Sequence, residues 1–319
     1  MAFTKNPNWN RRNGNKKSAY TTDLGEMLNF SIEDFLESDR CKEMHGKVDL
    51  IFTSPPFPLL SPKAYGNSTG DEYLNWMASL APKFRELLSP TGSVVIEIGN
   101  AWEHKRPVMS LVPLQTLIEF AEKGPFSVCQ QFICHNPARL PGPASWVTLK
   151  SIRLKDSYTH VWWYAATDEP KSDSKNVLVE YSKGMKALLK RQSYNAGRRP
   201  SGHEVSEGSF LKDRGGAIPP SALDLAGELN SFLSISNTKS NADYSEWCRK
   251  KDVPAHPARM QEVLAEFFIR FLTDENDLVF DPFGGSNTTG AVAESLGRRW
   301  IATERDQNYV LGSMGRFQD

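Results

Sequence analysis

The sequence contains few cysteines, no long apolar stretch and no excess of charge of either sign. Its four cysteines form no C-x-x-C pair, so neither a metal site nor a disulfide framework is expected. No apolar run approaches the roughly 20 residues that a membrane-spanning helix requires. The N-terminal residues are basic and polar and lack the apolar segment of a secretory signal. These absences predict a protein of the cell interior with reduced thiols and no membrane contact.

The charged residues are balanced in number but unevenly distributed. The chain has 38 Lys and Arg against 38 Asp and Glu, and this balance argues against a general polyanion binder. Residues 1–17 nevertheless contain five basic residues and no acid, and residues 171–220 contain ten basic residues against five acids. Such asymmetry indicates either a surface that faces phosphates or a solvated polar face.

Strand-like and helix-like patterns alternate in two blocks of the chain. Buried strands are expected at "VDLIFTS", "SVVIEIG", "VCQQFICHN" and "THVWWYAAT", and later at "DLVF" and "RRWIATE". Apolar residues at helical spacing predict helices at 71–88, 110–123, 260–273 and 286–297. This alternation predicts an α/β fold in which helices cover both faces of a sheet.

Residues 168–252 differ in composition from both blocks. They are rich in Gly, Pro, Ser, Asn and basic residues, as in "YNAGRRPSGHEVSEGS", and they are too long for a simple loop. We therefore expect an inserted, irregular module between a first block at 19–167 and a second block at 253–319. A basic arm at 1–18 precedes them.

The segment "DLVFDPFGGSNTTGAVAESLGRRWIATERD", residues 277–306, has the layout of a βαβ nucleotide-binding unit. A strand ends at Asp281, a tight loop contains Gly284 and Gly285, and a second strand ends at Glu304 after a helix. Glycines allow a ligand to approach the backbone closely. An acid at the end of the second strand can accept hydrogen bonds from ribose hydroxyls.

The glycine loop lacks both the G-x-G-x-x-G pattern and the lysine of a P-loop. Asp281 adds a negative charge beside the loop, which suits a cationic ligand with a ribose better than a pyrophosphate. S-adenosylmethionine is such a ligand, because it combines a sulfonium, an ammonium and a ribose. The same residues also fit an ordinary strand–turn–helix, in which Asp281 caps the helix and Glu304 is a surface acid.

The stretch "IFTSPPFPLL", residues 51–60, ends a buried strand with prolines and an aromatic ring. Ser54 Oγ and the Pro55 carbonyl are two acceptors on a rigid turn. Aimed at the N–H bonds of an amino group, they would draw its nitrogen towards a nucleophilic geometry. Phe57 would stack on a base rotated out of a duplex. Alternatively, the prolines simply end the strand and Phe57 joins the core.

The two motifs together resemble those of amino-group DNA methyltransferases, with Ser-Pro-Pro-Phe as catalytic motif and Asp-Pro-Phe-Gly-Gly-Ser as cofactor motif. Their order in the chain resembles the circularly permuted β class. The form Thr-Ser-Pro-Pro-Phe is similar to the cytosine-N4 enzymes of type II restriction–modification systems. The similarity continues through "KAYGN", "LPGPASWVTLKSIRLKDSYTHVWW", "RPSGHEVS" and "GGAIPP", over most of residues 19–310.

This resemblance implies a Rossmann-like methyltransferase sheet with an inserted target-recognition region. Residues 19–167 would be the catalytic half, 253–319 the cofactor-binding half and 168–252 the target-recognition insertion. The implied cofactor is S-adenosyl-L-methionine and the implied substrate is double-stranded DNA. The resemblance further implies a bacterial or archaeal cytoplasm near the nucleoid, a possible cognate restriction endonuclease, and a monomer or homodimer.

The expected site residues fall into three groups. The catalytic residues are Ser54, Pro55, Pro56 and Phe57. The cofactor residues are Thr53, Asp281, Pro282, Phe283, Gly284, Gly285, Ser286 and Glu304, together with His256 and Arg259 of "AHPARM". The DNA-binding residues are Lys63, Tyr65, Arg191, Arg198, Arg199 and His203, since arginine pairs readily with guanine edges. Glu97, Gly99 and Asn100 either border the same cleft or lie on the surface.

These residues predict methyl transfer to cytosine N4 by base flipping and in-line displacement. Transfer to cytosine C5 would need a cysteine nucleophile, which in that family follows a proline, and no cysteine here does. An adenine-N6 enzyme of the same class is the nearest alternative. A non-catalytic DNA-binding protein on the same scaffold is an alternative of another kind.

Overall fold

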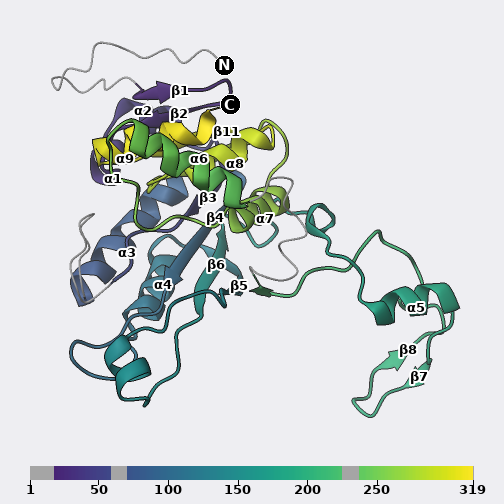
Figure 1. Cartoon of the computed structure of the whole chain (residues 1–319). Helices are drawn as coiled ribbons and strands as arrows, with labels where there is room; N and C mark the ends of the chain where they lie inside the picture. The colour runs from purple at the N-terminus through teal and green to yellow at the C-terminus, as the bar shows by residue number, and fades with distance from the viewer. Residues whose placement is uncertain (1–17, 59–69, 225–236, 319) are drawn as a thin grey trace.

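One mixed sheet forms the centre of the molecule (Figure 1) in the computed structural model, which describes residues 18–58, 70–224 and 237–318. Its nine strands lie in the order β1-β2-β11-β10-β3-β4-β6-β5-β9. Their bounds are Tyr20–Thr21 for β1, Gly25–Leu28 for β2, Val48–Thr53 for β3, Leu88–Gly99 for β4, Ser127–His135 for β5, Tyr158–Ala165 for β6, Ala222–Asp224 for β9, Leu278–Asp281 for β10 and Arg299–Thr303 for β11.

The middle of this sheet is parallel. Strands β2, β11, β10, β3 and β4 run in one direction, and β6 lies antiparallel between β4 and β5. Strands β3 and β10 come from opposite ends of the sequence, yet they are neighbours that pair Ile51 with Phe280. Because they are parallel, the residues that follow both strands meet at one edge of the sheet. The predicted α/β fold is confirmed.

Helices cover both faces of the sheet, as the alternation of β3 requires. Leu50 and Phe52 pack into an apolar cluster with α7, α8 and α9, whereas Ile51 packs into a second cluster with α1, α3 and α4. The bounds are Ile32–Leu36 for α1, Asp39–Glu43 for α2, Gly70–Leu87 for α3, Val112–Lys123 for α4, Glu262–Leu272 for α7, Thr288–Ser295 for α8 and Gln307–Ser313 for α9.

The expected insertion at 168–252 divides among several places. Strand β9 pairs with β5 and so belongs to the main sheet. Helix α6 (Asn237–Lys250) packs against α9 and the 3₁₀ helix η4 (Met314–Phe317), and the 3₁₀ helix η2 (Ser174–Val177) packs against α7. The part that projects away from the sheet in Figure 1 contains α5 (Lys183–Arg191), β7 (Gly197–Arg198) and β8 (Glu204–Val205). We call residues 183–205 the projecting arm.

Within the described ranges, no helix has both the length and the apolar character needed to cross a membrane. Residues 1–17 of the expected basic arm lie outside these ranges, as do Lys63 and Tyr65.

Candidate active site

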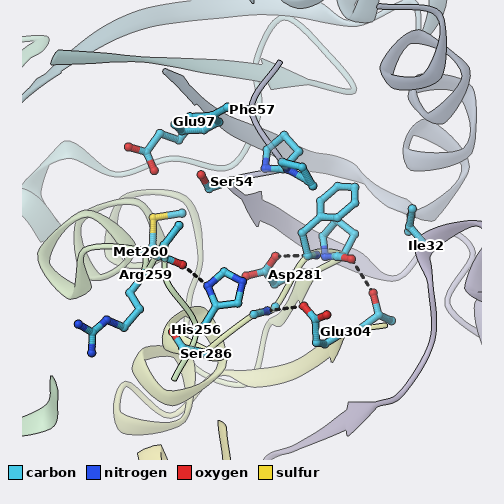
Figure 2. A pocket seen from close by; sticks show the side chains of 18 of the residues that line it. Ile32, Ser54, Phe57, Glu97, His256, Arg259, Met260, Asp281, Ser286 and Glu304 are labelled. Atoms are coloured by element: carbon cyan, nitrogen blue, oxygen red, sulfur yellow. Dashed lines mark hydrogen bonds between the residues drawn. The ribbon is translucent and has the colours of Figure 1, made fainter. Parts of the chain in front are cut away.

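The two sequence motifs open into one pocket at the carboxyl edge of the parallel strands. The pocket has a volume of about 620 Å³, within the usual range for small-molecule sites. Its walls include all four residues of the Ser54–Phe57 turn and all six of the Asp281–Ser286 loop, along with Glu304, His256 and Arg259. Figure 2 shows Ser54, Phe57 and Glu97 at one end of the pocket, Glu304 and Ile32 at the other, and Asp281 between them.

Ser54 lies at the first of these ends, directly after β3, with the carboxyl of Glu97 as its side-chain neighbour. Glu97 comes from β4, accepts a hydrogen bond from Thr159 Oγ1 at 2.8 Å and is also hydrogen-bonded to Ser54. Burial raises the pKa of Glu97, while the bonds to Thr159 and Ser54 and the charge of Arg139 oppose that rise. An ionised Glu97 can accept a hydrogen bond from the Ser54 hydroxyl, and the serine lone pairs then remain available to accept from a ligand.

The Phe57 ring packs against Gly99, where the absence of a side chain leaves room for it. A methyl group at Gly99 would lie 2.6 Å from Phe57 Cε2, so a larger residue there would displace the ring. Phe57 is half-buried and keeps one part of its surface at the pocket. Glu97 lines the pocket as expected, whereas Gly99 supports the Phe57 ring and, like Asn100, does not line the pocket itself.

Asp281 joins the two motifs. Its Oδ1 accepts from Thr53 Oγ1 at 2.7 Å and from the Phe283 amide at 3.1 Å, and its Oδ2 accepts from Thr289 Oγ1 at 2.7 Å. The side chain is buried, which raises the pKa of the carboxyl against these three hydrogen bonds. Asp281 thus fixes the start of the glycine loop onto β3 and adds negative charge to the pocket wall. Thr53 acts through this contact and does not line the pocket.

Glu304 closes the glycine loop from the neighbouring strand. Its Oε2 accepts from the Gly285 amide at 3.0 Å and its Oε1 from the Asp306 amide at 2.8 Å. Gly285 has φ +52°, and a Cβ at this position would lie 3.3 Å from the His256 ring. Each carboxylate oxygen has a further lone pair, so Glu304 can accept hydroxyl protons of a ligand as well.

His256 and Arg259 lie on the segment that precedes α7. The imidazole Nδ1 contacts the Ala258 carbonyl, and the ring packs edge-on against Tyr309 at 4.5 Å between centroids. Burial lowers the pKa of His256, so the ring is neutral at neutral pH. The Arg259 side chain is exposed and lies 5.7 Å from the centre of the Tyr244 ring.

The end of the pocket near Glu304 also has an aromatic wall that the sequence did not indicate. Trp76 of α3 packs edge-on against Phe283 with ring centroids 5.6 Å apart, and its Nε1 donates to Glu33 at 2.7 Å. Phe30 and Ile32, which follow β2, line the same region. These residues come from separate segments of the chain, so no local motif marks them.

A second group that sequence reasoning missed supports the loop from behind. Arg316 has a fully buried side chain that donates to Glu262 at 2.7 Å, to the Ser286 carbonyl at 3.2 Å and to Ser286 Oγ at 3.3 Å. Its guanidinium lies 4.9 Å from the centre of the Tyr244 ring. Asn287 has φ +55° and caps α8 by accepting from the Gly290 amide. Both residues fix the position of Ser286.

The predicted DNA-binding residues that the structure describes lie on the projecting arm and do not line the pocket. Arg191, Arg198 and His203 are exposed, whereas Arg199 is half-buried, donates to the Asn195 carbonyl and lies 5.6 Å from the Tyr194 ring centre. The basic excess counted at 171–220 is partly neutralised, because Lys171 pairs with Asp277 at 2.7 Å. Among the described residues no cluster of His, Cys, Asp and Glu could hold a metal ion.

Comparison with known proteins agrees with this geometry. A model of the N6/N4 DNA methylase family matches residues 48–314. The type II methyltransferase M.PvuII of Proteus hauseri is 41% identical over 309 residues, which span 96% of this chain and 88% of that protein. The solved structure of the cytosine-N4-specific PvuII DNA methyltransferase has a TM-score of 0.73 and 36% identity, over 96% of this chain and 91% of that one.

A more distant structure shares the fold alone. The Thermus thermophilus protein TTHA0409, solved in complex with S-adenosyl-L-methionine, has a TM-score of 0.52 and 17% identity over 91% of both chains. The matches to the family model and to M.PvuII cover most of the chain. The Ser54–Phe57 turn and the Asp281–Ser286 loop, the two motifs that resemble those of amino-group DNA methyltransferases, line one pocket. The chain belongs to the N6/N4 DNA methylase family.

Proposed function

We propose that this DNA methyltransferase transfers a methyl group from S-adenosyl-L-methionine to the N4 amino group of a cytosine that is rotated out of duplex DNA. The observation that carries the proposal is the single pocket lined both by the Ser54–Phe57 turn and by the Asp281–Glu304 unit. The cytosine-N4 specificity of the PvuII enzyme, whose structure matches this one with a TM-score of 0.73, supports the choice of base and atom.

The residues at the Glu304 end fit the proposed cofactor. Glu304 has acceptors for ribose hydroxyls, Asp281 contributes negative charge, and Gly285 leaves space beside the loop. Ile32, Phe283 and Trp76 offer an apolar wall for an adenine ring. When bound, S-adenosyl-L-methionine supplies a methyl carbon on a cationic sulfur, which departs as a neutral thioether.

The residues at the Ser54 end then act on the amino group. Ser54 Oγ and the Pro55 carbonyl would accept hydrogen bonds from its two N–H groups. The nitrogen lone pair would then turn out of conjugation with the ring and attack the methyl carbon. Glu97 would hold the Ser54 proton away from the substrate. As the N–C bond forms and the C–S bond breaks, the nitrogen would lose one proton to Ser54 Oγ, which would pass its own proton to the Glu97 carboxylate. Phe57 would stack on the rotated base.

The projecting arm would read the DNA sequence. Its exposed Arg191, Arg198 and His203 suit contacts with base edges and phosphates. Pairing with a cognate restriction endonuclease and residence in the bacterial or archaeal cytoplasm are parts of the same proposal. The type II name and the bacterial source of M.PvuII support both.

Product analysis tests the proposal. The protein is incubated with methyl-labelled cofactor and unmethylated duplex DNA, and the DNA is digested to nucleosides for mass spectrometry. We expect label in N4-methylcytosine. Label in N6-methyladenine would replace the proposed target with adenine, and label in C5-methylcytosine or in no nucleoside would refute the proposed chemistry. Salt-dependent DNA binding without cofactor affinity would instead indicate a non-catalytic binding protein.

A further inference from the structure

Two loops form a small lobe beside the pocket, the first of them directly after β4, whose Glu97 lines the pocket. We call residues 100–111 and 137–157 the rim lobe. The second loop begins and ends in the pocket wall, because Asn136, Arg139 and Tyr158 all line the pocket. In Figure 1 this loop includes the short teal helix at the bottom of the molecule, far from the projecting arm.

The two loops of the rim lobe are joined by three contacts. Asn100 Nδ2 donates to Asp156 Oδ1 at 2.9 Å, and Arg153 Nε donates to the Pro107 carbonyl at 2.8 Å. The rings of Trp102 and Trp146 pack with their centroids 5.4 Å apart. These contacts join the two loops into one structural unit.

The second loop is also held in place at its base. Lys155 Nζ donates to the Pro137 carbonyl at 2.7 Å, and Arg139 Nη1 donates to the Tyr158 carbonyl at 2.8 Å. Fixing the loop in the free protein reduces the ordering entropy that binding would otherwise cost. The solvent-exposed side chains of the rim lobe can therefore contact a partner without rearrangement at the base of the second loop.

Apolar side chains are unusually exposed on this lobe. Leu140 is 86% exposed, Leu149 79% and Leu154 90%, and the large exposed apolar residues Met109, Leu111 and Ile152 belong to the same two loops. A gathering of large exposed apolar side chains on one feature marks an interaction surface.

The charge of the lobe indicates the kind of partner. It contains six cations against two acids, Glu103 and Asp156, and Asp156 is engaged by Asn100. The cations are Lys105, Arg106, Arg139, Lys150, Arg153 and Lys155. Across residues 18–58, 70–224 and 237–318 none of the six forms a salt bridge. The lobe therefore carries a formal charge of +4 in a chain of zero net charge.

We propose that the rim lobe is a second docking surface for duplex DNA, apart from the projecting arm, and that it holds the duplex beside the pocket mouth. Its cations would face phosphates, and Leu140, Leu149 and Leu154 would pack against sugars and base edges. A second copy of the chain fits the surface less well, because a two-fold interface would bring two clusters of cations together. The proposal rests on the proposed function, since it takes DNA as the substrate.

The test removes charge from the lobe without touching its internal contacts. Lys105, Arg106 and Lys150 are exposed and make no side-chain hydrogen bond among the described residues, so all three are changed to alanine in the full chain. Binding to a random-sequence duplex is measured by fluorescence anisotropy over a salt series. We expect the slope of log affinity against log salt to fall by about 2 to 3, since each phosphate contact contributes about 0.9.

A matched control loses the same charge at the opposite edge of the sheet. Lys47, Lys83 and Lys123 are exposed, and Lys47 precedes β3 whereas Ser54 follows it. The control triple alanine variant should keep a slope within about 1 of the wild-type slope. Equal slopes for wild type, lobe variant and control would overturn the proposal.

Changes to the apolar residues separate DNA from a second copy as the partner. Leu140→Ala with Leu154→Ala should weaken duplex binding at high salt while leaving the salt slope unchanged. Sedimentation that shows a dimer abolished by these two changes would overturn the proposal in favour of self-association. Cofactor binding by calorimetry should match wild type in every variant, which confirms folding. A wild type that binds duplex through the lobe but methylates no DNA would refute the proposed function alone.

Discussion

At the catalytic end of the pocket, Ser54 has Glu97 as its side-chain partner, whereas at the cofactor end Asp281 receives three hydrogen bonds from the protein. Gly285, Ser286 and Glu304 are likewise bonded to one another or to buried residues. The cofactor end is therefore built as a closed network that stabilises the fold. The catalytic end relies on proline stiffness and leaves its acceptors for a substrate.

This difference separates the consequences of substitution. A change at the catalytic end should slow methyl transfer while leaving folding and cofactor affinity intact. A change in the cofactor network should weaken stability and cofactor affinity together, because the same hydrogen bonds serve both.

The largest effect is expected for Ser54→Ala. Loss of one preorganised hydrogen-bonding group at the reacting centre should lower the single-turnover rate by about 100-fold or more. The rate is measured with labelled cofactor, and cofactor affinity by calorimetry should stay within about twofold. Ser79→Ala, on the exposed face of α3, is the control. A normal rate in Ser54→Ala would remove the serine from the mechanism.

The next largest effect is expected for Arg316→Met, which removes the support behind the loop. It leaves Glu262, 7% exposed, without its buried cation, so we expect the free energy of unfolding to fall by about 3 kcal/mol. Urea unfolding measures this, with the exposed Arg299→Met as control.

Adding Glu262→Gln to Arg316→Met should restore part of the lost stability, since no unpaired carboxylate then remains buried. Cofactor affinity should fall in the single variant because Ser286 loses two hydrogen bonds. Additive losses in the double variant would contradict the role given to this ion pair.

Asp281→Asn should have a smaller effect of the same kind. The amide presents a donor where Thr53 or Thr289 already donates, so we expect about 2 kcal/mol less stability and weaker cofactor binding. Thermal unfolding with and without cofactor measures both quantities. If stability fell while affinity stayed at the wild-type level, Asp281 would serve the fold alone.

The smallest effect is expected for Glu97→Gln, which should change how the stability of the protein depends on pH. The folded-state pKa of Glu97 is raised by burial. The carboxyl therefore contributes stability below its ordinary pKa, and this is lost as pH rises through the folded-state value. The glutamine variant does not titrate, so its stability relative to wild type should increase over that rise. Denaturant unfolding at a series of pH values measures the difference.

Transfer activity should change in the opposite sense with pH. Only the ionised Glu97 can accept the Ser54 proton, so the wild-type rate should rise as pH passes through the folded-state pKa, and the glutamine variant should lose this step. An unchanged acidic limb in the variant would show that another group controls the rate.

The sequence allowed the sheet and both motifs to be predicted because their signals are local. A buried strand, a proline turn and a glycine loop each occupy a few consecutive residues, and the resemblance placed Ser54 and Asp281 in one site. Arg316, Trp76 and Glu33 were not predicted, because their roles depend on contacts between segments that are distant in the chain. The division of residues 168–252 was not predicted either, because β9 is only three residues long and joins the sheet through pairing with the distant β5.

The most direct test is to map methylation in DNA from cells that express the wild type or Ser54→Ala. We expect N4-methylcytosine at one recurring short sequence in the first sample and none at that sequence in the second. Modification at cytosine C5, at adenine or at no site in the wild-type sample would contradict the proposed reaction. The same modification in both samples would contradict the role of Ser54.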